Sequence, residues 1–125
     1  MKNYIYDYLK FKLGSESADY EFEIIPIPPY DFIEANLSLE PYEYFGDIQF
    51  ILGLKFKQVI LYYNADVLMR VVIKFRGNKL SFIKQFLETS DINFNSTTMF
   101  LKMYFSSESK ETVVVYQHPI LNNKL

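Results

Sequence analysis

The sequence contains no cysteine, no tryptophan and a single histidine, His118, among its 125 residues. The absence of cysteine excludes disulfides, thiolate nucleophiles and cysteine-ligated zinc sites. One histidine cannot form a two-histidine metal site, and the four glycines are isolated, so no glycine-rich phosphate loop is present. The serines have no nucleophile-elbow motif around them. We therefore expect no catalytic residue, no cofactor, no metal and no enzymatic activity.

Long apolar runs are also absent. The longest, such as residues 59–63, fall far short of the ~18 residues that a membrane-spanning helix needs. The first residues lead into polar sequence without the apolar stretch of a signal peptide. We expect a cytoplasmic protein that does not enter a membrane.

Apolar material for a core is plentiful, since half of the residues are hydrophobic and 18% are aromatic. We predict a single domain over residues 1–125, with residues 1–16 and 119–125 at its periphery. Arginine occurs only at Arg70 and Arg76, whereas residues with AT-rich codons are common. This bias suggests a low-GC genome, or a phage or other mobile element within one.

The first half of the chain shows one alternating and one helical pattern. Residues 19–27 alternate apolar and acidic positions, which predicts a half-buried strand, and the three prolines between 26 and 29 end it. Residues 38–53 place apolar side chains at helical spacing, with Gly53 as a stop, which predicts a helix. Residues 2–13 fit either a helix or a strand.

The second half has clearer signals. Residues 55–63 and 66–76 are rich in β-branched and aromatic types and flank a turn at 64–66, which predicts a hairpin. A helix is predicted over 79–89, with Asn78 as its cap. A polar loop over 90–96, strands over 97–105 and 111–117, and a frayed tail over 122–125 complete the chain.

These elements define the predicted fold class, α+β. We expect an antiparallel sheet of about five strands with two helices on one face. The order matches the ferredoxin-like βαββαβ plan with an extra C-terminal strand. Another α+β sheet with helices on one side is the alternative.

Charge is distributed unevenly along the chain. No lysine or arginine occurs between Lys12 and Lys55, and tyrosines are interspersed with the carboxylates there. Such a segment attracts basic partners, and tyrosines commonly anchor interfaces. The alternative is that the acids fold against the basic strands and their charges cancel. The predicted partner-binding residues are Tyr20, Glu21, Glu23, Tyr30, Asp31, Glu34, Glu40, Tyr42, Glu43, Tyr44 and Asp47.

The functional hypothesis is a small non-enzymatic protein-binding module of the immunity-protein or phage-inhibitor kind. Its acidic, tyrosine-rich surface would bind a basic partner such as a nuclease or a nucleic-acid-binding enzyme, and it would repel nucleic acid itself. One alternative is a self-assembling structural subunit that pairs through strand 111–117 as an open edge. Another is an enzyme that uses paired carboxylates such as Glu21 and Glu23, although no motif supports it.

An RNA-binding domain is a further alternative. Basic and aromatic side chains of strands 66–76 and 97–105 would then face outward from a ferredoxin-like sheet, as in RNA-recognition domains. Two observations oppose it: the aromatic-glycine signature is missing, and the first strand would present Asp19, Glu21 and Glu23 to the phosphates.

Overall fold

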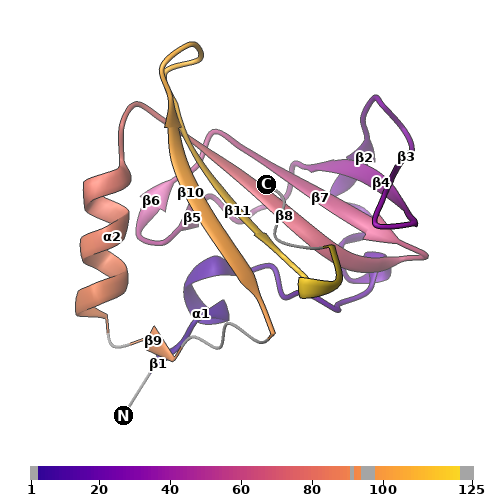
Figure 1. Cartoon of the computed structure of the whole chain (residues 1–125), viewed down its shortest axis with the longest axis horizontal. Helices are drawn as coiled ribbons and strands as arrows, with labels where there is room; N and C mark the ends of the chain where they lie inside the picture. Colours follow the sequence, from indigo (N-terminus) through magenta and orange to yellow (C-terminus); the bar gives the residue numbers. More distant parts are fainter. Residues whose placement is uncertain (1–2, 91, 94–97, 122–125) are drawn as a thin grey trace.

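A computed structural model describes residues 3–90, 92–93 and 98–121. Its main feature is a seven-stranded antiparallel sheet with the order β10-β11-β8-β7-β4-β2, in which β3 also pairs with β4 (Figure 1). The sheet strands are β2 (Ile24–Pro26), β3 (Phe32–Glu34), β4 (Leu37–Tyr44), β7 (Gln58–Asn64), β8 (Val67–Arg76), β10 (Phe100–Ser106) and β11 (Glu111–Gln117).

Shorter elements surround this sheet. β1 pairs in parallel with β9, and β5 and β6 form a small hairpin. Figure 1 shows α2 standing to one side of the sheet and α1 near the lower ends of the strands. Their bounds are β1 (Asn3–Tyr4), α1 (Tyr6–Leu9), η1 (Ser17–Tyr20), β5 (Phe50–Ile51), β6 (Leu54–Lys55), α2 (Leu80–Thr89), β9 (Ile92–Asn93) and η2 (Pro119–Leu121).

The main core lies on the face of the sheet that α1, α2 and the β5–β6 hairpin cover. Alternate residues of the central strands point into it, because side chains of a strand alternate between the two faces. Segment 1–16, expected at the periphery, instead buries Leu9 and Phe11 in this core, and α2 contributes Ile83. The sheet's share of the buried cluster is Tyr44, Val59, Leu61, Tyr63, Leu68, Val71, Ile73, Phe75, Val114 and Tyr116.

A second, smaller core lies on the opposite face. Leu39, Met69 and Leu121 are buried there, with Leu37 and Tyr62 packed against them. Leu121 belongs to η2, so residues 119–121 also take part in packing rather than lying at the periphery. The rest of the expected frayed tail, residues 122–125, lies outside the described residues, as does most of the expected loop over 90–96.

The predicted hairpin at the centre of the chain is confirmed. β7 and β8 pair in antiparallel register, and Ala65 and Asp66 take positive φ angles in the turn between them. The ladder shifts register between Tyr62 and Tyr63. This irregularity reverses the alternation, so Leu68 is buried and Val67 is exposed, contrary to the simple pattern. The helix predicted over 79–89 is also confirmed, as α2.

The predicted helix over 38–53 is wrong, because this stretch forms β4 and β5. β4 pairs with β2 and β3 on one side and with β7 on the other, which satisfies its backbone without helical bonds. The Pro41 carbonyl accepts the Ile27 N–H at 3.1 Å, so it points toward the end of β2 and away from β7. The proline nitrogen, which carries no hydrogen, faces the same side, and Pro41 is therefore tolerated inside β4.

The predicted strand over 19–27 is mostly wrong. Residues 17–20 form the 3-10 helix η1, a turn follows, and only Ile24–Pro26 pair with β4. Phe22, expected on the buried face, is 86% exposed. The expected strands 97–105 and 111–117 are β10 and β11, with residue 97 outside the described part of the chain.

The ferredoxin-like plan is therefore wrong, as is the expectation of about five strands under two helices. The main sheet has seven strands, and within the described residues α2 is the single helix longer than the four-residue α1 and η1. No helix in that part of the chain has the length and apolar character needed to cross a membrane. The predicted edge at 111–117 is also wrong: β11 lies between β8 and β10, all seven of its residues are buried, and β10 forms the outer edge.

Candidate functional site

The acidic segment occupies one end of the sheet and is separated from the basic segments. β4 pairs with β7, whose sequence QVILYYN has no charged residue, so no lysine or arginine lies directly across from the β4 carboxylates. Glu34 forms an ion pair with Arg70. No other carboxylate of segment 16–47 makes an ion pair with a described residue. Among the described residues, ion pairing between the acidic segment and the basic strands is therefore limited to Glu34 and Arg70.

The predicted partner-binding residues differ in their exposure. The fully exposed ones can contact a partner directly, and the half-buried ones present an edge or a hydroxyl. Tyr44 is only 5% exposed, so it supports the surface rather than contacting a partner. The exposed residues are Glu21, Tyr30, Asp31, Glu40 and Asp47, and the half-buried ones are Tyr20, Glu23, Glu34, Tyr42 and Glu43.

Tyr44 fixes the position of a neighbouring carboxylate. Its hydroxyl donates to Glu23 Oε2 at 3.1 Å and accepts the N–H of Ile48 at 3.0 Å. Burial raises the pKa of Tyr44, and the nearby carboxylates act in the same direction, so the hydroxyl stays protonated and remains a donor. A Cβ at Gly46 would overlap Glu23 and Tyr44, which is why glycine is required at this close approach.

Aromatic packing makes this part of the surface rigid. The Phe11 ring centroid lies 4.9 Å from that of Tyr44 in an edge-on geometry and 5.3 Å from that of Tyr20 in a tilted geometry. Beside them, the Tyr42 hydroxyl donates to Glu40 at 3.2 Å. Burial first, and then Glu40, raises the pKa of Tyr42. Hydroxyl–carboxylate pairs thus rest on an aromatic layer that belongs to the core.

Large apolar side chains are exposed within the same segment, and of these only Tyr30 was among the predicted partner-binding residues. They are concentrated along β2, β3 and the flanking turns, where no further strand of the described chain pairs with the edge. The three prolines between 26 and 29 were a usable cue, because prolines are typical of a sheet edge. The exposed fractions are 86% for Phe22, 67% for Ile33, 64% for Tyr30, 57% for Phe45 and 50% for Ile25.

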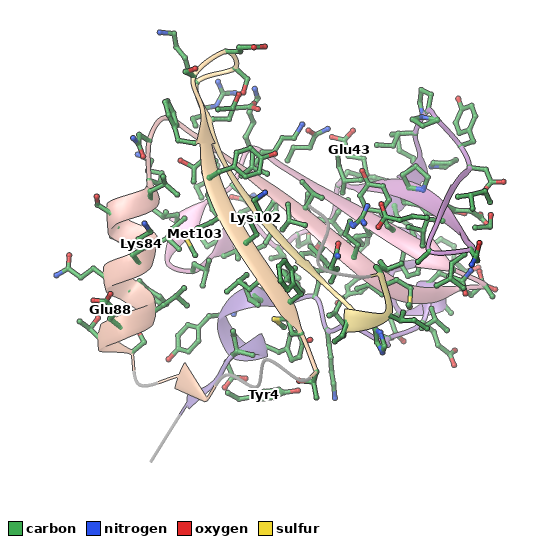
Figure 2. The ribbon with its side chains drawn as sticks, in the orientation of Figure 1. Tyr4, Glu43, Lys84, Glu88, Lys102 and Met103 are labelled. Atoms are coloured by element: carbon green, nitrogen blue, oxygen red, sulfur yellow. The ribbon has the colours of Figure 1, made fainter. Side chains whose placement is uncertain are left out.

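These residues follow an edge rather than a single flat face. Ile25 is directly opposite Glu43 across the β2–β4 ladder, so both side chains lie on one face. Ile33 is opposite Ser38, and both lie on the other face of the sheet. The Ser38 hydroxyl donates a hydrogen bond to Asp31. We call this combined surface of β2, β3, β4, the turn at 21–23 and the residues 45–47 that follow β4 the acidic edge. Figure 2 shows Glu43 on the side of the molecule away from Lys84 and Glu88 of α2.

The basic residues of β8 do share a face with those of β10, as the alternation predicts. Through β11, Arg70 lines up with Phe100, and Lys74 lines up with Tyr104. Arg70 is nevertheless occupied inside the protein: it pairs with Glu34, its Nε donates to Gln117 at 2.7 Å, and it stacks 5.4 Å above the Tyr62 ring. It is therefore not available to bind phosphate groups.

The other residues considered for catalysis or metal binding offer little chemistry. His118 is exposed, and its Nδ1 accepts the N–H of Ile120 at 3.0 Å. Glu21 and Glu23 lie in a turn, so they lack the strand spacing on which the carboxylate-pair alternative depended. The described residues contain no group of three His, Cys, Asp or Glu side chains that could hold a metal.

No family model matches the chain, and no curated protein or solved structure matches it significantly.

Proposed function

We propose that this chain is a non-enzymatic protein-binding module that uses the acidic edge to bind a basic protein. An inhibitor or immunity protein that covers the cationic face of a nuclease or nucleic-acid-binding enzyme is the specific form of this proposal. The observation that carries it is the combination, along one edge, of unpaired carboxylates with exposed aromatic and aliphatic side chains. Exposed apolar groups of this kind mark interaction sites, and the carboxylates select a basic partner.

The test is a charge reversal at three positions of the edge. Glu21, Glu43 and Asp47 carry no ion pair with described residues, so Glu21→Lys, Glu43→Lys and Asp47→Lys together should leave the fold intact. Glu23 is left unchanged because it holds the Tyr44 hydroxyl. We expect the triple variant to lose the basic partner that the wild-type protein retains from lysate of its source, or of that organism's host, at low salt. Like charges across an interface cost several kcal/mol.

A matched control separates the site from net charge. Asp7, Glu88 and Glu108 are exposed and lie outside the edge, so Asp7→Lys, Glu88→Lys and Glu108→Lys change the net charge equally. The control variant should keep the partner, and circular dichroism should show both variants folded. Equal retention by the two triple variants would contradict the proposal.

The self-assembling alternative has to use a different strand. Because β11 is an interior strand, the edges available for pairing with a second copy are β10, which lacks proline but exposes Lys102, and β2, which contains Pro26. A lysine on an edge strand opposes pairing between sheets. Sedimentation at high protein concentration tests this alternative, and a strict monomer would exclude it.

A further inference from the structure

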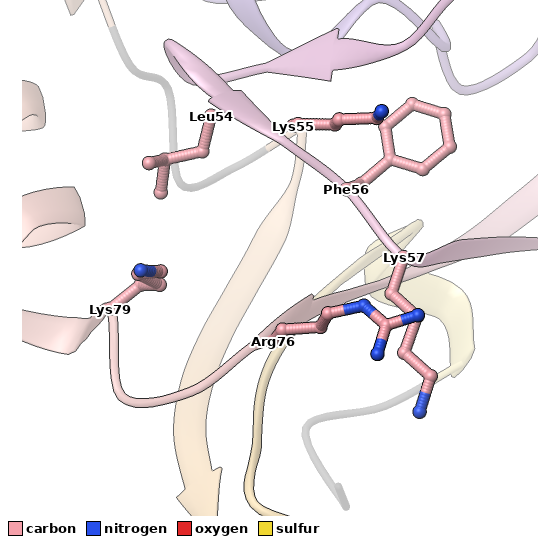
Figure 3. A pocket seen from close by; sticks show the side chains of 6 residues that line it. All are labelled: Leu54, Lys55, Phe56, Lys57, Arg76 and Lys79. Atoms are coloured by element: carbon pink, nitrogen blue, oxygen red, sulfur yellow. The ribbon is translucent and has the colours of Figure 1, made fainter.

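A pocket of about 540 Å³ lies where β7 begins and β8 ends. Three segments that are distant in sequence form it: the β6 strand with the residues after it, the end of β8, and the residue that precedes α2. Figure 3 shows Arg76 extending away from Lys79, toward the side of the view where Lys57 lies, with Lys79 and Leu54 on the opposite side. The lining residues are Leu54, Lys55, Phe56, Lys57, Arg76 and Lys79.

Four of these six side chains are cationic, and one of them is already neutralised. Lys57 forms an ion pair with Glu111, which lies opposite Arg76 across the β8–β11 ladder. The hydrogen bond from Lys57 lowers the pKa of the Glu111 carboxyl, so this pair stays ionised and cancels internally. Lys55, Arg76 and Lys79 make no ion pair within the described chain, which leaves the pocket with three uncompensated positive charges.

The backbone holds these cations in place. Lys79 donates its N–H to Thr112 Oγ1 at 2.7 Å, and the same hydroxyl donates to the Gly77 carbonyl at 2.7 Å. The Gly77 N–H in turn donates to the Lys110 carbonyl at 2.9 Å. The segment between β8 and α2 is thus fixed to β11. The positive end of the α2 helix dipole lies next to Lys79 and adds to the positive potential.

Three cations line one pocket and have no ion-pair partner within the described chain, which is characteristic of an anion site. The volume lies in the range of small-molecule pockets and exceeds what a bare phosphate needs. Leu54 and Phe56 supply apolar surface beside the cations. We propose that this pocket binds a small organic phosphate, with the uncompensated cations of its lining, Lys55, Arg76 and Lys79, attracting the phosphate group and Phe56 contacting the organic part.

The test uses inorganic phosphate and adenosine monophosphate as probes. We expect adenosine monophosphate to bind more tightly by calorimetry, because it can also contact Phe56. In amide-detected NMR, its addition should shift the signals of residues 54–57 and 76–80. Arg76→Gln combined with Lys79→Gln should weaken binding by roughly tenfold or more, since charge-assisted contacts to phosphate are lost. Phe56→Ala should reduce the affinity for adenosine monophosphate and leave that for inorganic phosphate unchanged.

The control removes two positive charges elsewhere. Lys12 and Lys84 are exposed and do not line the pocket, so Lys12→Gln with Lys84→Gln should bind the nucleotide as the wild type does. An equal loss in this control would overturn the proposal, because diffuse charge would then explain the binding. Equal affinity for both probes would overturn the organic-phosphate assignment. The absence of binding by either probe at millimolar concentration would overturn the site itself. Thermal melts of each variant confirm that the fold is retained.

Discussion

Two buried tyrosines in the main core differ in one hydrogen bond. The Tyr116 hydroxyl donates to the carbonyl of Phe11 and so ties the N-terminal segment to β11. The Tyr63 hydroxyl is also buried, yet it has no hydrogen-bond partner within the described residues. Burial raises the pKa of both side chains, so each remains a neutral phenol at physiological pH.

Replacing each tyrosine by phenylalanine separates these two situations. Tyr116→Phe should lower the free energy of unfolding by about 1–2 kcal/mol, because it leaves a buried carbonyl without its donor. Tyr63→Phe should leave stability unchanged or raise it, because it removes a buried hydroxyl that makes no bond. Urea unfolding of both variants provides the comparison. Equal losses in the two variants would contradict the assigned hydrogen bonding.

At the scale of elements, the β5–β6 hairpin depends on its contact with α2. Its turn places Leu52 and Gly53 at positive φ, the conformation that two-residue hairpin turns require. A Cβ at Gly53 would lie 3.2 Å from the Phe86 ring of α2. Phe86 in turn packs edge-on against Tyr8 of α1 at 5.2 Å between ring centroids. Gly53 therefore occupies a turn position that has positive φ and that leaves little space for a side chain beside α2.

Gly53→Ala should therefore cost more than a positive φ alone explains. The left-handed backbone costs a residue with a Cβ about 1–2 kcal/mol. Overpacking against Phe86 should add roughly 1 kcal/mol. Gly14→Ala is the matched control, because Gly14 also has positive φ but has nothing within 4 Å of its Cβ position. Thermal unfolding should show a larger loss of stability for Gly53→Ala than for Gly14→Ala. An equal loss of stability in the two variants would show that Phe86 moves aside freely.

Segment 38–53 is a stretch for which the local sequence pattern predicted the wrong element. Tyr42, Phe45, Ile48 and Leu52 have helical spacing, but Tyr42 lies in β4, Phe45 is exposed and Leu52 lies in a turn. Helical spacing over so few residues can arise by chance. The local sequence also does not indicate that β7 and β2 are available as pairing partners for β4. The β7–β8 hairpin was predictable because its partner strand is adjacent and its turn chemistry is local.

At the scale of the whole molecule, charge is separated along the long axis. The acidic edge lies at the end formed by β2, β3 and β4, and the cationic pocket lies toward β6 and α2 (Figure 1). The uncharged strand β7 lies between β4 and β8. Screening at physiological ionic strength acts over about 8 Å, so charges at the two ends influence each other weakly.

Reversing the acidic edge should consequently leave the pocket unaffected. The Glu21→Lys, Glu43→Lys variant should bind adenosine monophosphate with a dissociation constant within about twofold of the wild-type value at physiological ionic strength. Calorimetry with the same probe measures this. A tenfold tighter affinity in the reversed variant would show that the acids compete for the pocket cations and that the two ends are coupled.

The local sequence was sufficient for the central hairpin, helix α2, the β10 and β11 strands and the absence of cysteine chemistry. It also located the acidic, tyrosine-rich segment, because charge and residue type are properties of the chain itself. Only the tertiary structure decided that 38–53 forms strands, that β11 is interior, that Tyr44 is buried and that Phe22 is exposed. The physical reason is that strands satisfy their backbone groups through partners distant in sequence, so exposure and strand order depend on which segments pair.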